Sequence, residues 1–128
     1  MDVNTNRKFV VDASFILAYL LNEKNAEVER IMQLHKKSEI TLVSLSLLKY
    51  EVGNTLRTAV LKKRINKQLA VKVFLAFLDL KITEEKIDYN MVLKKALSNQ
   101  ITFYDVSYLY LAQNCRLPLL TLDSSLRI

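Results

Sequence analysis

Four short, largely apolar segments of the chain have the character of strands, and segments with helical periodicity separate them. These strand-like segments cover residues 8–11, 39–43, 78–82 and 118–122. Strands that alternate with helices predict a parallel sheet, because a helical crossover brings the chain back to the same end of the sheet. We therefore predict an α/β fold in which helices cover both faces of a central, mainly parallel, four-stranded sheet.

The helices are predicted from apolar residues that recur at three- and four-residue steps. They cover residues 13–21, 25–38, 45–63, 66–77, 84–98 and 102–114. Ser44 and Thr102 are expected to cap the third and the last of these helices. Asp123 is expected to cap a final short helical turn.

The composition limits the fold and the partners. The chain has 128 residues, 51% of them hydrophobic, with one Gly and one Pro, which predicts a single domain over 1–128 without linkers. No apolar run is long enough to span a membrane, and the polar N-terminus lacks a signal-peptide core, so a cytoplasmic protein is expected. The net charge of +6 favours a polyanionic partner, although a merely solubilising surface would look the same.

The single histidine and the single cysteine exclude several kinds of site. One cysteine cannot form an intrachain disulfide or a cysteine-rich zinc site, and a Ser-His-Asp triad is not expected. We expect His35 to lie exposed on an amphipathic helix and Cys115 to be at least half-buried. Tyr104, Tyr108 and Tyr110 are expected in the core or at a dimer surface, with stacking on a base as the alternative.

Four acidic residues stand where the fold would bring them together. Asp12 and Asp123 follow predicted strands, and Asp105 lies in the first turn of the helix before the last strand. Glu51 interrupts the apolar face of its helix. Ligand sites in parallel sheets lie beyond the carboxyl ends of the strands, so these residues are expected to form a carboxylate cluster at that edge.

Each acid also has a local explanation. Asp12, Asp105 and Asp123 could simply cap helices, and Glu51 could pair with Lys49. Asn54, one turn after Glu51, could instead hold the Glu51 carboxylate. Capping alone, however, would require several independent caps to fall at one edge of the sheet.

A carboxylate cluster needs a compensating cation, and a site of oxygen ligands suits Mg²⁺ or Mn²⁺. Such ions assist the hydrolysis of phosphodiesters. The alternatives fit less well: the third residue of an Asp-x-Asp phosphatase motif is here Ser14, and a single glycine cannot form a glycine-rich phosphate loop.

The chain resembles the PIN-domain ribonucleases, which include the VapC toxins of toxin–antitoxin pairs. The resemblance lies in four short motifs that occur in family-like order over nearly the whole chain, at residues 10–14, 44–54, 102–108 and 120–126. It implies a three-layer α/β/α sandwich. Relatives usually continue into a final helix and edge strand, whereas five residues, 124–128, follow Asp123 here. Either the chain is a short member of the family or the last edge strand is absent.

The resemblance implies a Mg²⁺- or Mn²⁺-dependent endoribonuclease. In it, Asp12, Glu51 and Asp105 would bind metal, and Asp123 would support a second ion or the attacking water. The resemblance assigns accessory polar roles to Ser14, Asn54 and Thr121. The candidate contacts to the RNA backbone are Lys62, Lys63, Arg64 and Lys67, which could also be a solvated helix end.

The same resemblance implies an antitoxin partner and a homodimer. Two other functions stay open: a non-catalytic PIN-like module that binds RNA or protein, and a housekeeping RNA-processing nuclease. A neighbouring gene for a small DNA-binding protein would distinguish a toxin pair from the housekeeping enzyme.

Overall fold

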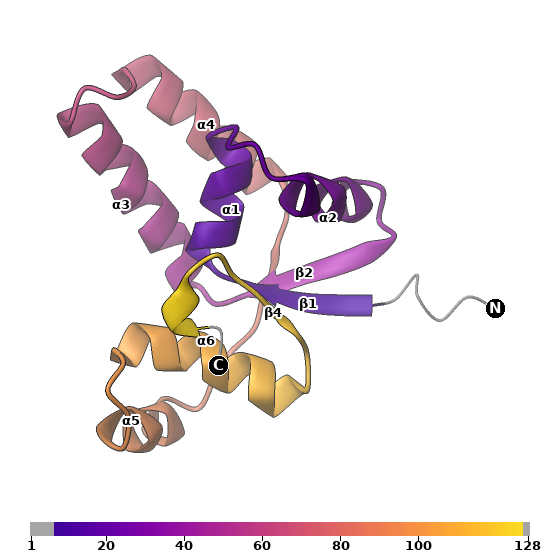
Figure 1. The fold of residues 1–128 in the computed structure, drawn as a ribbon, viewed down its shortest axis with the longest axis vertical. Helices are drawn as coiled ribbons and strands as arrows, with labels where there is room; N and C mark the ends of the chain where they lie inside the picture. The colour runs from indigo at the N-terminus through magenta and orange to yellow at the C-terminus, as the bar shows by residue number, and fades with distance from the viewer. Residues whose placement is uncertain (1–6, 127–128) are drawn as a thin grey trace.

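A computed structural model describes residues 7–126, in which four parallel strands form one sheet in the order β3-β2-β1-β4 (Figure 1). The strands are β1 (Arg7–Val11), β2 (Ile40–Ser44), β3 (Thr83–Glu84) and β4 (Leu119–Leu120). The helices are α1 (Ala13–Leu20), α2 (Ala26–Lys36), α3 (Leu47–Leu61), α4 (Lys67–Asp79), α5 (Tyr89–Leu97) and α6 (Phe103–Cys115), followed by the short 3-10 helix η2 (Ser124–Leu126). The predicted α/β fold with a four-stranded parallel sheet is confirmed.

The central strand β1 separates two apolar cores, because successive side chains of a strand point to opposite faces. Phe9 and Val11 pack into the core that α1, α2, α3 and α4 cover. Val10 lies on the other face, in the core that includes Tyr108 and Leu111 of α6. Figure 1 shows α5 and α6 below the sheet and the other four helices above it, which gives the three layers.

Polar side chains begin most of the helices by accepting hydrogen bonds from backbone N–H groups that no helical carbonyl can reach. Thr102 accepts a bond of 3.1 Å from the Asp105 N–H, so the predicted cap of α6 is confirmed. The other helices that begin with such a bond are α1, α2, α4 and α5, at Asp12, Asn25, Asn66 and Asp88.

The third strand was predicted wrongly. Helix α4 continues to Asp79, and the strand itself is only Thr83–Glu84. The alternation of apolar and polar residues over 78–82 resembles a strand, but Phe77 is buried in the core and holds the last turn of α4 there. The helix predicted over 84–98 accordingly begins later, at Tyr89.

Three further residues differ from the sequence predictions. Ser44 is the last residue of β2 and not a helix cap, since α3 begins only at Leu47. His35 is half-buried, and Cys115 is exposed. Between residues 7 and 126 no strand follows β4, and no helix there is both long and apolar enough to cross a membrane.

Candidate carboxylate site

The fold brings the four predicted acids to one edge of the sheet. Burial raises the pKa of Glu51, and the negative charges of Asp12 and Asp105 raise it further, against the lowering effect of a hydrogen bond from Tyr108. Burial also raises the pKa of Asp105, and the negative charges of Asp123 and then Asp12 raise it further. Each acid is therefore close enough to at least one other for their charges to interact, and we call the four the carboxylate cluster.

The carboxylate of Asp12 is the best anchored of the four. The residue is only 4% exposed. Oδ1 accepts hydrogen bonds from the Phe15 N–H at 3.1 Å and from the Ser14 hydroxyl at 2.7 Å, and Oδ2 accepts one from the Thr121 hydroxyl. Asp12 is therefore both the cap of α1 and a member of the cluster, so the local and the functional explanations are compatible.

Ser14 and Thr121 connect the start of α1 to the segment after β4. The Ser14 hydroxyl oxygen accepts a bond of 2.9 Å from the Leu122 N–H, and the Thr121 hydroxyl oxygen accepts one of 3.0 Å from the Asp123 N–H. Both residues were predicted as accessory groups, and the structure places both on the Asp12 carboxylate. Asp123 itself caps η2, as predicted, since Oδ1 accepts from the Ser125 N–H at 3.0 Å.

Glu51 is held by a residue that the sequence did not single out for the site. The Tyr108 hydroxyl, on α6, donates a hydrogen bond of 2.6 Å to Glu51 Oε1 on α3. Burial and then Glu51 raise the pKa of Tyr108, so it acts as a neutral donor, while a hydrogen bond with Ser44 works in the opposite direction. The signal for Tyr108 was its spacing, because it lies one helical turn after Asp105 and on the same side of α6.

The alternative partners of Glu51 do not take part. Lys49 pairs with Glu84 at 2.7 Å and not with Glu51. Asn54 is exposed, and the hydrogen bonds found for residues 7–126 include none between it and Glu51. A surface ion pair therefore does not explain Glu51, and the role predicted for Asn54 in holding its carboxylate is not seen.

The cluster lacks a cation among the described residues. In the range 7–126 the ion pairs are Arg30 with Glu27 and Lys49 with Glu84, and neither involves the cluster. Within that range, no group of three or more Asp, Glu, His or Cys side chains is close enough to ligate one ion. Charge repulsion between carboxylates acts over longer distances than the bonds from carboxylate oxygens to a metal ion. The acids are therefore close enough to repel one another but are not arranged around one ion.

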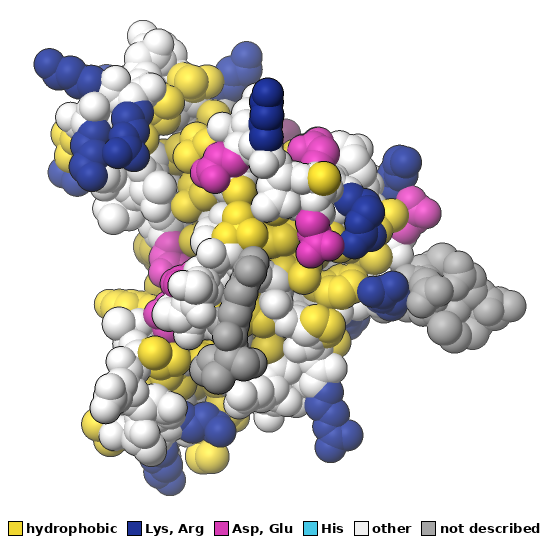
Figure 2. All heavy atoms as spheres, in the orientation of Figure 1, with side chains coloured by type: hydrophobic (Ala, Val, Ile, Leu, Met, Phe, Trp, Pro, Cys, Tyr) yellow, Lys and Arg dark blue, Asp and Glu magenta, His cyan; other side chains and the backbone are white. Residues whose placement is uncertain are grey.

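The predicted RNA-contacting residues lie away from the acids. Lys62, the residue that follows α3, is eleven residues after Glu51, or about 16 Å along the helix axis. With Lys63, Arg64 and Lys67 it forms the exposed turn between α3 and α4. Figure 2 shows basic side chains around the outer end of this helix pair and acidic side chains in the recess between it and the α5–α6 layer.

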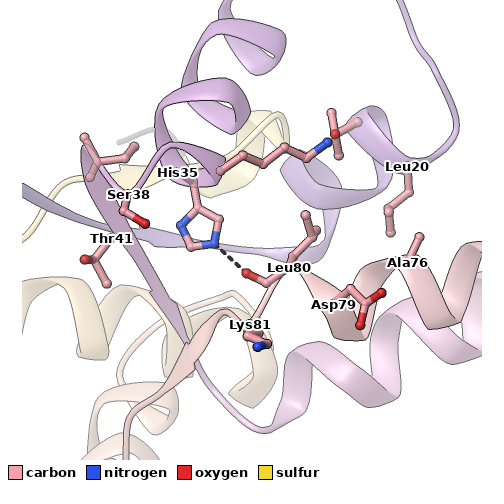
Figure 3. Close-up of a pocket in the computed structure, with 11 residues that line it drawn as sticks. Leu20, His35, Ser38, Thr41, Ala76, Asp79, Leu80 and Lys81 are labelled. Atoms are coloured by element: carbon pink, nitrogen blue, oxygen red, sulfur yellow. Dashed lines mark hydrogen bonds between the residues drawn. The ribbon is translucent and has the colours of Figure 1, made fainter.

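A cavity of about 590 Å³ lies apart from the cluster. It is lined by His35, by the first residues of β2 and by the end of α4, among others, as Figure 3 shows. His35 Nε2 donates a 2.6 Å bond to the Leu80 carbonyl, and Nδ1 accepts a 3.3 Å bond from the Leu42 N–H. The imidazole therefore connects three segments of the backbone, which gives it a structural role.

Comparison with known proteins supports the fold. No family model matches the sequence, and no curated protein matches it. Among solved structures, the chain is similar to the crystal structure of PAE2754 from Pyrobaculum aerophilum, with a TM-score of 0.76 and 29% sequence identity. The similarity covers 94% of this chain and 84% of the Pyrobaculum chain, so the two share their architecture over most of their lengths.

Proposed function

We propose that this protein is a divalent-metal-dependent endoribonuclease of the PIN-domain type. The observation that carries the proposal is the cluster of Asp12, Glu51, Asp105 and Asp123, in which burial and then the neighbouring negative charges raise the pKa values of Glu51 and Asp105. Four separate segments of a basic chain supply these carboxylates at the ligand-binding edge of a parallel sheet. Their repulsion is unfavourable unless a cation joins them, and oxygen ligands suit Mg²⁺ or Mn²⁺.

In this proposal Asp12, Glu51 and Asp105 hold the ion, and Asp123 supports a second ion or the attacking water. A bound ion would neutralise charge on the phosphodiester and make water a stronger nucleophile. Ser14 and Thr121 position the Asp12 carboxylate, and Tyr108 positions that of Glu51. The basic turn at Lys62, Lys63, Arg64 and Lys67 would bind the RNA backbone at a distance from the acids.

The biological setting that we propose is a VapC-type toxin restrained by an antitoxin, acting as a homodimer. A housekeeping nuclease would use the same site. Co-purification of the protein with the product of a neighbouring gene, and loss of cleavage in that complex, would support the toxin assignment over the housekeeping one.

A non-catalytic RNA-binding module is the second candidate. It is favoured by the finding that no three acids between residues 7 and 126 are gathered around a common point. Against it stands the cost of holding partly buried carboxylates together without use, because desolvation and repulsion both oppose their ionisation.

Cleavage of a labelled mixed-sequence RNA tests the two candidates. We expect cleavage with Mg²⁺ or Mn²⁺ and none with EDTA, and we expect Asp12→Asn to abolish it. The control is Asp88→Asn, because Asp88 caps α5 as Asp12 caps α1 but is exposed and outside the cluster. RNA binding without cleavage in any metal would contradict a general nuclease and leave the non-catalytic module or an unusually selective toxin.

A further inference from the structure

A hollow of about 200 Å³ lies at the same edge of the sheet as the carboxylate cluster. Its aromatic lining consists of Tyr50 at the start of α3, Tyr89 at the start of α5, and Phe103 and Tyr104 at the start of α6. Glu85, which follows β3, is the charged side chain in the lining. We call this site the aromatic hollow.

The aromatic hollow and the acids occupy neighbouring halves of one edge. In the sheet order β3-β2-β1-β4, the hollow lies beyond β2 and β3, while Asp12 and Asp123 follow β1 and β4. In two places a residue of the hollow is the sequence neighbour of an acid of the cluster: Tyr50 precedes Glu51, and Tyr104 precedes Asp105. An RNA strand with a phosphate at the acids would therefore place a neighbouring nucleotide at the hollow.

The aromatic rings of the hollow contribute little to the core. Tyr50 is 75% exposed, Tyr89 63% and Tyr104 58%, whereas Tyr108 on the same α6 is buried. The hollow has the volume of roughly six or seven waters at about 30 Å³ each, which suits one flat ring system and is too small for a helix. Exposed aromatic faces beside a small cavity are suited to stacking.

We propose that the aromatic hollow binds one unpaired base of the RNA, next to the phosphate at the carboxylate cluster. The inference rests on the proposed nuclease function and deepens it, because it names a second point of recognition beside the phosphate. Tyr50 and Tyr104 supply the stacking surfaces. The small volume of the hollow and the exposed faces of its tyrosines favour a single base over a protein segment as the occupant.

Glu85 gives the hollow a preference among bases. An ionised carboxylate only accepts hydrogen bonds, so it favours a base edge that presents donors. Guanine presents an N–H and an amino group side by side on its Watson–Crick edge, and an unpaired base in RNA has that edge free. The backbone of Glu85 is fixed, since its N–H donates a 2.8 Å bond to the Ser44 carbonyl. We therefore infer that guanine is preferred.

The test is binding of fluorescein-labelled RNA hexamers in Mg²⁺, measured by fluorescence anisotropy. The binding measurements use an Asp123→Asn background, which slows cleavage and leaves the three proposed metal ligands in place. Hexauridine is compared with hexamers that carry one central guanosine or one central adenosine. The variants are Tyr50→Ala, Tyr104→Ala and Glu85→Gln. The control is Leu75→Ala, which removes a side chain that is 57% exposed on α4, outside the hollow.

We expect each tyrosine variant to weaken binding about tenfold, the usual loss for one stacked base, and Leu75→Ala to have no effect. Glu85→Gln should remove the preference for guanosine over adenosine. Tyrosine variants that bind like Leu75→Ala would overturn the inference, and if such variants still cleave RNA in Mn²⁺ the nuclease proposal survives. Tyr104→Ala that dissociates a dimer without changing RNA affinity would show an interface between copies instead. Wild type that neither binds nor cleaves RNA would contradict both proposals.

Discussion

The hydroxyl of Tyr108 donates a hydrogen bond of 2.6 Å to the Glu51 carboxylate, and this contact joins α6 to α3 across the candidate site. The two residues lie 57 positions apart in the chain. A hydrogen bond to the ionised form of an acid favours that form, so Tyr108 lowers the pKa of Glu51 against the effects of burial and of two neighbouring acids.

Tyr108→Phe should therefore change both stability and pH dependence. The loss of the donor should lower the free energy of unfolding by about 1 kcal/mol, measured by urea denaturation at pH 7.5. The pKa of Glu51 should rise, so the acidic limb of the pH–rate profile for RNA cleavage should move to higher pH. Tyr110→Phe, on the same helix, is the control and should change neither. An acidic limb that stays in place would separate Glu51 from catalysis.

Glu51→Gln should make the metal-free protein more stable at neutral pH. The pKa values of Glu51 and Asp105 are raised from 4.5 and 3.8, so the folded protein binds these protons more tightly than the unfolded chain does. The free energy of unfolding in EDTA should thus fall as the pH rises above these values. The variant, which keeps an acceptor for Tyr108, should exceed wild type by less than about 1 kcal/mol at pH 7.5.

The pH dependence of this difference identifies its cause. The advantage of Glu51→Gln should shrink as the pH falls through the raised pKa of folded Glu51, and it should be gone below 4.5, where the unfolded chain takes up this proton as well. At pH 7.5, Mn²⁺ should raise the melting temperature of wild type and have a smaller effect on the variant. A variant that is less stable than wild type at every pH would show that the charge of Glu51 does not destabilise the folded protein.

His35→Ala should destabilise the fold without involving the candidate site. The Leu42 N–H is buried and donates to His35 Nδ1, so removal of the imidazole leaves this donor without a partner. The cost should be about 2 kcal/mol in the free energy of unfolding, measured by urea denaturation. Gln33→Ala, an exposed change on the same helix, should stay within about 0.5 kcal/mol of wild type. Equal stability of the two variants would contradict the bridging role of His35.

Replacement of Lys63 and Arg64 by Gln should weaken RNA binding and reduce its salt dependence. Each contact between a basic side chain and a phosphate of single-stranded RNA contributes about 0.7 to the slope of log affinity against log salt, so two contacts contribute about 1.4. The control is the double variant Lys24→Gln/Lys37→Gln, which removes the same charge from exposed positions on α1–α2 and α2–β2 connections. The two double variants should differ in slope; the same slope in both would mean that only total charge matters.

The sequence was sufficient to predict where the acids stand in the fold, because their positions depend on features that lie close together in the chain. Asp12 follows a buried strand, and Thr102 caps the helix that carries Asp105. Once the sheet is parallel, the ends of its strands meet at one edge whatever the details of packing.

The partners of those acids could not be predicted in the same way, since they depend on contacts between distant segments. Tyr108 looked like a core residue from its own helix, and only the placement of α6 and α3 around the same edge of the sheet brings its hydroxyl to Glu51. The error over 78–82 has a related cause: five residues fit both a strand and the end of a helix, and the burial of Phe77 decides between them.

The hydrogen bond between Asp12 and Thr121 joins residues 109 positions apart, near opposite ends of the domain. During synthesis, Asp12 leaves the ribosome long before the residue that fixes its carboxylate has been made. The proposed nuclease site therefore cannot form before the segment that carries Thr121 has emerged from the ribosome. Any RNA cleavage by a nascent chain would begin only after this late part of the fold has joined the first strand and helix.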